Sequence, residues 1–283
     1  MAIFNHQFIG RKKWEVVEKD TIDINCSSIT FYDPIGLSFL AGLLDFQSQV
    51  SDSIVIHFSP EVLNYLERID FFRFLDETFS IQITIKPERP RIRRRELKGS
   101  LLEFHRIEFS DKYQMRDIIQ ELAQITFERS KGAIPSEFVN DVFAELLDNI
   151  RRHSGKDCFF TVAQSYQNTV KISIADIGIG IPRKIKSQFT EVQTDSNAII
   201  YSTEPGVSTY VEGGWGLTIL RDYLEFSGEY LFIASNNGCV KFINTRPYVY
   251  PNYGCGFSGT FVEICFRTDV TRTPEIEENF LPF

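Results

Sequence analysis

The chain has 283 residues, of which 43% are hydrophobic and 26 are Phe, and its formal net charge is −8. This length suits two domains of ordinary size, and the aromatic content favours packed cores over disorder. The negative charge argues against a protein whose whole surface binds nucleic acid or an anionic membrane.

The five cysteines are scattered, without a C-x-x-C pair, so they predict neither a zinc site nor a disulfide framework. The amino terminus lacks the apolar run of a leader, and the most apolar internal stretch, IGLSFLAGLL, is too short to span a bilayer. We therefore expect a soluble, cytoplasmic protein without membrane contact.

Residues 1–85 predict a small βα domain. The strands TIDINC and SIVIHFS alternate with helical patterns at 36–49 and 60–75, which gives a βαβα order. Residues 86–99, KPERPRIRRRELKG, carry seven basic residues against two acidic ones. We interpret this stretch as a solvated linker, with a phosphate-binding patch as the alternative, and we do not expect nucleic acid as a partner.

Residues 100–268 predict a second domain, followed by a tail at 269–283. Its expected helices cover 111–130 and about 136–154. Its expected strands are LLEFHRIEF, CFFTVAQ, TVKISIA, LFIAS, CVKFIN and GTFVEICFR, with NNG as a hairpin turn. Together they predict an α+β fold with helices on one face of a largely antiparallel sheet.

The helix at about 136–154 carries polar residues in an unusual grouping. Its apolar stripe faces the core, whereas Glu145 and Asn149 lie four residues apart on roughly the opposite side. Taken alone, such a charged face is most often a solvated surface.

Two glycine motifs lie where the expected sheet meets its loops. DIGIGIP places Asp176 at a strand end and Gly178 and Gly180 in the turn beyond it, where a backbone can approach a ligand closely. EGGWGLTILRDYL places Gly214 and Gly216 at a helix start, which can bind an anion such as phosphate. Neither motif has the spacing of a Walker loop or a dinucleotide fingerprint.

The order of these motifs, completed by Gly259-Thr260 on the last strand, resembles the GHKL superfamily of ATP-binding proteins. This superfamily includes DNA gyrase, heat-shock chaperones, sensor histidine kinases, anti-sigma-factor serine kinases and MutL. The resemblance covers roughly residues 100–268, and ELLDNIRRHS is most similar to the anti-sigma-factor kinase branch. It implies a GHKL (Bergerat) α/β sandwich with a mixed, largely antiparallel sheet.

The resemblance also implies the roles of the site residues. Asn149 would hold Mg²⁺ against the phosphates of ATP, and Glu145 would orient or deprotonate the attacking water or hydroxyl. Asp176 would bind adenine with help from Thr260. The residues that would surround the nucleotide are Gly178, Gly180, Gly214, Gly216 and Leu217.

Further expectations concern the segments around these motifs. Residues 183–211 would form a mobile ATP lid, and His153 is expected to be a structural residue at the helix end. Trp215 interrupts the glycine pattern of histidine kinases, and no phosphoacceptor-histidine hairpin precedes the site, so we do not expect a sensor histidine kinase.

The first domain resembles, over a short stretch, the STAS domains of anti-sigma-factor antagonists. ITFYDPIGLSFLAGLL is similar to their strand-turn-helix segment. Those antagonists carry a phosphorylatable Ser or Thr after the aspartate that matches Asp33, whereas this chain has Pro34 and Ile35. We therefore expect a regulatory scaffold rather than a phosphoacceptor.

Two classes of function stay open. The first is an enzyme, either an ATP hydrolase or a protein-serine kinase, and the second is a nucleotide-gated interaction module. Glu145 favours an enzyme, because a pure binding site needs no base, and we prefer hydrolysis. We also expect a protein partner, such as a STAS-domain or signalling protein, and leave homodimer formation open.

Overall fold

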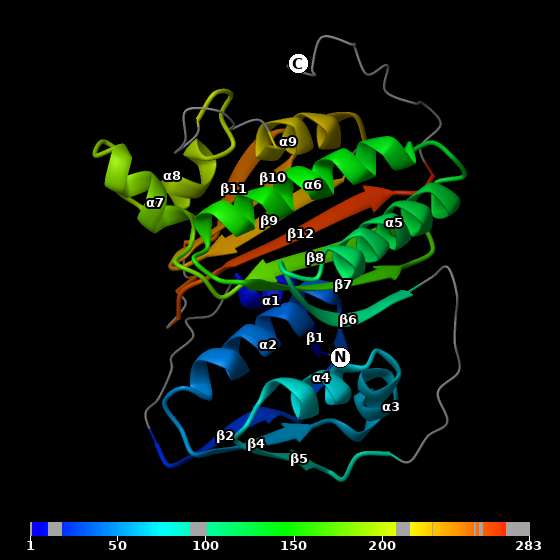
Figure 1. The fold of residues 1–283 in the computed structure, drawn as a ribbon, viewed down its shortest axis with the longest axis vertical. Coiled ribbons are helices and arrows are strands. Elements are labelled where there is room, and N and C mark those ends of the chain that lie inside the picture. Colours follow the sequence, from blue (N-terminus) through cyan, green and yellow to red (C-terminus); the bar gives the residue numbers. More distant parts are fainter. Residues whose placement is uncertain are drawn as a thin grey trace.

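The computed structural model describes residues 2–10, 19–90, 101–207, 216–227, 229–251, 253–254 and 257–269. Within these residues the chain forms a large seven-stranded sheet and a small three-stranded sheet, with helices of the amino-terminal part between them (Figure 1).

The amino-terminal part is built around the small sheet. Its elements are β1 (Ala2–Phe4), α1 (His6–Ile9), β2 (Thr21–Cys26), β3 (Ile29–Tyr32), α2 (Pro34–Gln47), β4 (Ser53–Phe58), α3 (Pro60–Arg68), α4 (Phe71–Thr78) and β5 (Gln82–Lys86). Strands β2, β4 and β5 form the small parallel sheet, and β1 pairs with β3 separately. The βαβα order is confirmed for this part, but β1, α1, β3 and β5 add to it.

The helix expected over 60–75 is two helices. The chain breaks at Asp70, whose φ of 58° lies in the left-handed region that Asp tolerates better than most residues. The break turns α4 so that Phe71, Phe72 and Phe74 are all buried. Helical periodicity continues through the break, and it therefore could not indicate where the first helix ends.

The carboxy-terminal part is built around the large sheet. Its strands are β6 (Leu101–Glu108), β7 (Cys158–Ser165), β8 (Thr169–Asp176), β9 (Tyr230–Ser235), β10 (Gly238–Ile243), β11 (Arg246–Val249) and β12 (Thr260–Arg267). They follow the order β11-β10-β9-β12-β8-β7-β6. Each neighbouring pair of described strands is antiparallel, so the expected mixture of strand directions is not found in this sheet.

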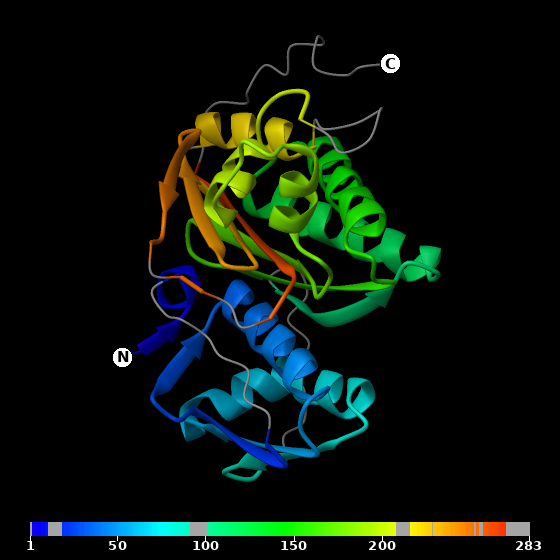
Figure 2. The same ribbon diagram turned by 90° about the vertical axis from the view of Figure 1, so that its left-hand side faces the viewer.

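Helices cover both faces of the large sheet. On one face lie α5 (Lys112–Arg129), α6 (Ser136–His153) and α9 (Gly216–Ser227), as expected. On the other face α2 packs against β7, β8 and β12, between the two sheets (Figure 2). The expectation of helices on one face is confirmed for the helices of residues 100–268, and the helix on the other face comes from the amino-terminal part.

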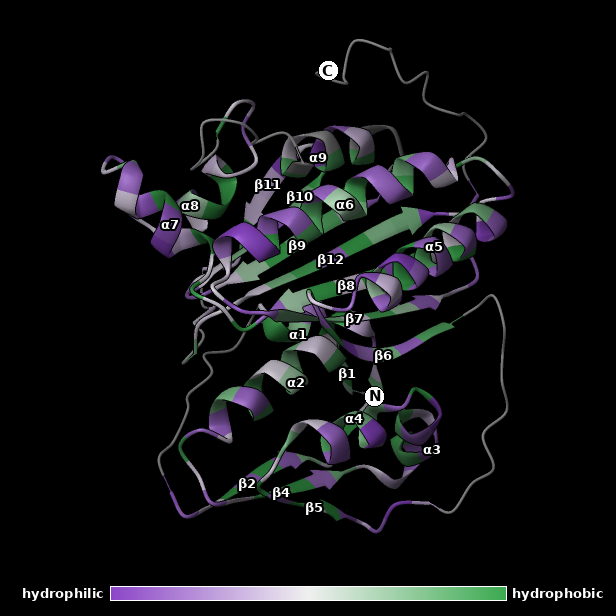
Figure 3. Cartoon of the chain, in the orientation of Figure 1, coloured by the Kyte–Doolittle hydropathy of each residue, from purple (hydrophilic) through white to green (hydrophobic). Residues whose placement is uncertain are grey.

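Successive side chains of β12 point to opposite faces of the sheet and pack in two different cores. Val262 and Ile264 belong to the core under α5, α6 and α9, whereas Phe261 and Cys265 belong to the core shared with α2. Hydrophobic colours follow the central strands, and the outer surface of α6 is largely hydrophilic (Figure 3). Burial on both faces makes this strand a long apolar run with a single buried charge, Glu263.

The segment expected as a mobile lid contains two helices, α7 (Ile181–Gln188) and α8 (Asp195–Tyr201). The Thr194 hydroxyl accepts a hydrogen bond from the Asn197 N–H and begins α8. Ile185 and Ala198 lie in a small core between the two helices. The expectation of a loop is therefore wrong for residues 183–188 and 195–201, and residues 208–211 lie outside the described part.

None of the described helices is both long enough and apolar enough to cross a membrane.

Candidate functional site

A pocket opens between α6, α7, α9 and the ends of β8 and β12. Its lining consists of Leu146, Asn149, Ile150, His153, Ser154, Ile174, Asp176, Gly180, Ile181, Lys184, Ile185, Ser202, Leu217, Thr260 and Val262. Apolar and polar side chains occur in equal numbers in this lining. This combination is typical of a small-molecule site.

Helix α6 supplies one wall of the pocket. Leu146, Asn149, Ile150 and His153 lie at spacings of three and four residues, so they share one side of the helix. Leu146 is buried, whereas Asn149 and His153 are half-buried. The helix thus presents an amide and an imidazole to the pocket above an apolar floor.

Asp176 is the buried acid of the pocket. It ends β8, and its side chain is only 3% exposed. The Gly178 N–H donates to Asp176 Oδ1 over 2.8 Å. Burial raises the pKa of Asp176 to about 7, although the Gly178 hydrogen bond and the charge of Lys156 oppose this rise. A carboxyl group at this depth can accept a hydrogen bond from a ligand amine, and such a bond is strong when the carboxyl is charged.

The turn after Asp176 requires its glycines. A Cβ on Gly178 would lie 2.2 Å from the Ser154 carbonyl oxygen, and Gly180 has a φ of +80°. The Asn236 side chain stabilises this turn, since its Nδ2 donates to the Ile179 carbonyl and its Oδ1 accepts from the Gly259 N–H. These contacts hold the turn against the start of β12.

Ser235 also connects the turn after Asp176 to the start of β12. Its hydroxyl donates to the Gly259 carbonyl over 2.8 Å and accepts from the Ile181 N–H over 3.0 Å. Its oxygen also lies 3.1 Å from the Thr260 hydroxyl. Ser235 and Asn236 are therefore supporting residues that the sequence indicated only as the end of a strand and a hairpin turn.

The pocket brings together most of the residues predicted to bind a ligand. Asn149, Asp176, Gly180, Leu217 and Thr260 all line it. Gly178 lies behind the lining, where its N–H holds Asp176, and Gly216 begins α9 one residue before Leu217. Gly214 lies outside the described residues.

Glu145 lies apart from the pocket lining. It is exposed on α6, one turn before Asn149. The two residues were predicted to share the nucleotide side of the helix, but only Asn149 lines the pocket, and the Glu145 carboxylate lies towards solvent.

Four polar residues of the pocket, His153, Ser154, Lys184 and Ser202, were not predicted as ligand-binding groups. His153 was expected to be structural and is indeed the last residue of α6, but its side chain also lines the pocket. Burial lowers the pKa of His153, and the charges of Lys184 and Arg152 add to this effect. Lys184, on α7, lies in the segment interpreted as a loop. The four-residue spacing from Asn149 to His153 is the signal that could have identified the histidine.

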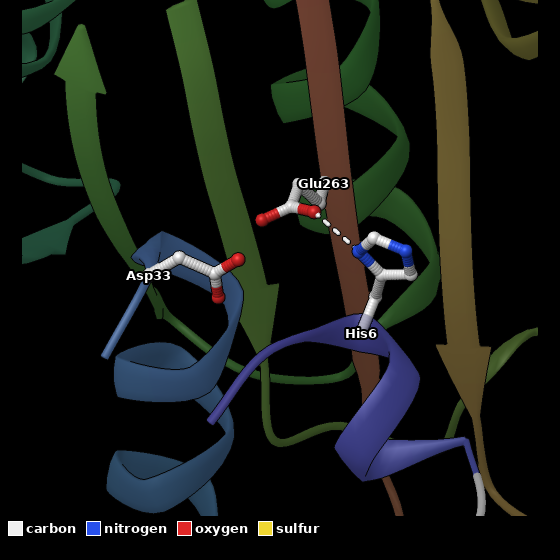
Figure 4. Close-up of side chains that lie close together, drawn as sticks. All are labelled: His6, Asp33 and Glu263. Atoms are coloured by element: carbon white, nitrogen blue, oxygen red, sulfur yellow. Dashed lines mark ion pairs between the residues drawn. The ribbon is translucent and has the colours of Figure 1, made fainter. Parts of the chain in front are cut away.

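A second polar cluster lies on the opposite face of the large sheet. His6, Asp33 and Glu263 are buried there, with ligand atoms within 4.8 Å of one another (Figure 4). His6 Nδ1 lies 3.3 Å from Glu263 Oε1, and the Tyr230 hydroxyl donates to the same oxygen over 2.7 Å.

A lysine ammonium group already neutralises this cluster. Lys171 Nζ donates to Asp33 Oδ2 over 3.0 Å, and despite burial the charges of Glu263 and Asp33 raise the pKa of Lys171. His6 Nε2 faces a second ammonium, Lys241 Nζ, at 3.0 Å. Two cations beside two carboxylates fit a buried ionic joint between α1, α2 and the sheet better than a metal site.

The pocket lies within a region of the chain that matches a known protein family. Residues 135–264 match the family described as histidine kinase-, DNA gyrase B-, and HSP90-like ATPase. The match begins one residue before α6 and ends within β12, so it includes all the residues that line the pocket. It supports a GHKL-type ATP-binding domain in this part of the chain. No curated protein matches the chain.

Proposed function

We propose that this chain is an ATP- and Mg²⁺-dependent regulatory protein that binds and hydrolyses ATP. The observation that carries the proposal is the convergence of Asn149, Asp176 and Thr260 on one apolar pocket within the matched domain. The amino-terminal part, which we propose to be STAS-like, would regulate this site or bind a protein partner.

The residues of the pocket fit the chemistry of adenosine triphosphate. Ile174 and Val262 offer apolar walls to a flat base, and the Asp176 carboxylate can accept from its exocyclic amine. The Thr260 hydroxyl lies on the neighbouring strand at the position paired with Asp176. The base of a nucleotide bound there would therefore contact one charged group, the Asp176 carboxylate, and one neutral group, the Thr260 hydroxyl.

Asn149 suits the phosphate end, because an amide oxygen is a hard ligand of the kind that Mg²⁺ prefers. When bound, the metal would neutralise part of the charge on the phosphates. The Glu145 carboxylate, one turn away, would accept a proton from a water molecule, and the oxygen of this water would attack the γ-phosphorus. The bond from this phosphorus to the bridging oxygen then breaks, and ADP and phosphate leave.

The exposure of Glu145 favours a second candidate, a protein-serine kinase. A base at the solvent side can accept a proton from the hydroxyl of another protein as readily as from water. In that case the γ-phosphate would move to a serine oxygen. If Glu145 acts on neither nucleophile, the chain is a nucleotide-gated interaction module.

Contacts of α2 support a regulatory role for the amino-terminal part. An added Cβ on Gly42 would lie 2.6 Å from Phe261 and 2.7 Å from Ile177, the residues that follow Thr260 and Asp176. The Ser38 hydroxyl is hydrogen-bonded to that of Ser173 over 2.8 Å. A shift of α2 would therefore move the ends of β8 and β12, which line the pocket.

Labelled ATP tests these alternatives directly. We would incubate the γ-labelled nucleotide with the protein, alone and with cell extract, and follow the label. Free phosphate supports hydrolysis, and a labelled serine in another protein supports the kinase. Binding without either product, under conditions in which ATP is saturating, supports the module and contradicts the enzyme.

A further inference from the structure

We propose that Lys184 binds the phosphate groups of the nucleotide; this inference rests on the proposed function and adds a residue to it. Neither the glycine motifs nor the family match indicates this lysine as a ligand-binding group.

The first argument is the charge of the pocket lining. Among the described lining residues, Lys184 is the only lysine or arginine, and Asp176 is the only carboxylate. His153 is held towards its neutral form because its pKa is lowered. A polyphosphate entering this pocket would therefore meet Lys184 as the one lysine or arginine among the described lining residues.

The second argument is that Lys184 is held in place without being neutralised. On α7 it shares one side with Ile181 and Ile185, which also line the pocket, and Ile185 is buried in the small core beside α8. Lys186 forms an ion pair with Asp195, whereas Lys184 makes no ion pair within the part of the chain that the structure describes. Its ammonium group thus remains available to an anion.

The third argument concerns position within the pocket. Lys156 is the cation that acts on the pKa of Asp176, whereas Lys184 acts on that of His153. Lys184 therefore lies near His153, at the end of α6. Phosphates would be repelled by Asp176 and attracted to Lys184, so the charges favour one orientation of the ligand, with its base at Asp176.

Nucleotides of increasing charge provide the test. Calorimetry with adenosine, ADP and ATP, in the presence of Mg²⁺, would compare the native chain with Lys184→Met, which keeps the apolar stem and removes the charge. We expect about 10- to 100-fold weaker binding of ADP and ATP, since a charged hydrogen bond is lost, and less than about twofold change for adenosine. Lys184→Arg should restore most of the affinity.

Arg183→Ala is the matched control, because this neighbour is exposed and outside the pocket lining. Its affinities should equal those of the native chain. Unchanged ATP affinity in Lys184→Met, or an equal loss for adenosine, would overturn the inference while leaving the proposed function intact. Failure of the native chain to bind ATP would overturn both.

Discussion

Asp176 and Thr260 face each other across the antiparallel pair of β8 and β12, at the end of both strands where the pocket begins. One residue is a buried acid and the other a half-buried hydroxyl. Strand register sets this pairing, and the Ser235 hydroxyl oxygen, 3.1 Å from that of Thr260, supports it.

The first prediction concerns this pair. Asp176→Asn replaces a charged acceptor by a weaker one, so ATP affinity should fall by about 1.5 to 3 kcal/mol. The Asn oxygen can still accept from the Gly178 N–H, which protects the turn. Calorimetry measures the change in ATP affinity. Thr260→Val, which removes a neutral hydroxyl, should weaken ATP binding less. Normal ATP binding by Asp176→Asn would contradict the role of the pocket in nucleotide recognition.

The second prediction is a pH dependence of binding. The pKa of Asp176 is raised from 3.8 to about 7, so below pH 7 the group is increasingly neutral and a weaker acceptor. ATP affinity should therefore rise as the pH increases from 6 to 8. Thr260→Val should keep this slope, and Asp176→Asn should lose it. Equal slopes in all three proteins would assign the effect to the nucleotide itself.

The same group affects the stability of the free protein. Because its folded-state pKa is raised, the stabilisation that comes from the neutral carboxyl is complete below about pH 3.8 and is lost as the pH rises through about 7. Above pH 7, Asp176→Asn should have a larger free energy of unfolding than the native chain. Urea denaturation at pH 6 and pH 8 measures the difference, which should be greater at pH 8.

The third prediction separates chemistry from binding. Glu145→Ala should bind ATP normally but release phosphate about 10² to 10⁴ times more slowly, because general-base assistance is lost. Asp141→Ala, an exposed acid one turn earlier on the same helix, is the control and should keep the native rate. Hydrolysis at the native rate by Glu145→Ala would rule out its role as the base.

The fourth prediction concerns the metal. Asn149→Ala should keep the contacts of the base with Asp176 and lose the dependence of ATP affinity on Mg²⁺. Titrations with and without the metal would show two different affinities in the native chain and a single affinity in the variant. A variant that still responds to Mg²⁺ like the native chain would place the metal ligand elsewhere.

The fifth prediction concerns the contact of α2 with the sheet. Gly42→Leu places a side chain against Phe261 and Ile177, so it should destabilise the fold by about 1 to 3 kcal/mol and weaken ATP binding. Gln49→Ala, at the exposed end of this segment, is the control. Loss of stability with unchanged ATP affinity would mean that α2 does not influence the pocket.

The sequence predicted those parts of the fold in which local pattern and final environment agree. Helix α6 is one example, since Val139, Phe143 and Leu147 are buried, as the periodicity predicts, and Glu145 is exposed on the other side. The strand before Asp176 is another. In both, the signal is contained within about ten neighbouring residues.

The features that were missed depend on distant partners. Glu263 on β12 is buried because His6 and Tyr230 contact it, and neither is near it in sequence. The layer formed by α2 likewise depends on an encounter with the back of the sheet. Lys184 was overlooked because its helix is short and polar, with only Pro182 and Ile185 buried.

The position of α2 has a practical consequence for producing fragments of this protein. A fragment beginning near residue 100 would expose Phe160, Phe232 and Phe261 to water on the back of the sheet. It would also leave Glu263 without His6, on a surface prone to aggregation. Biochemical work on the pocket therefore calls for an expression boundary ahead of β1, with the amino-terminal part retained as an internal solubility partner.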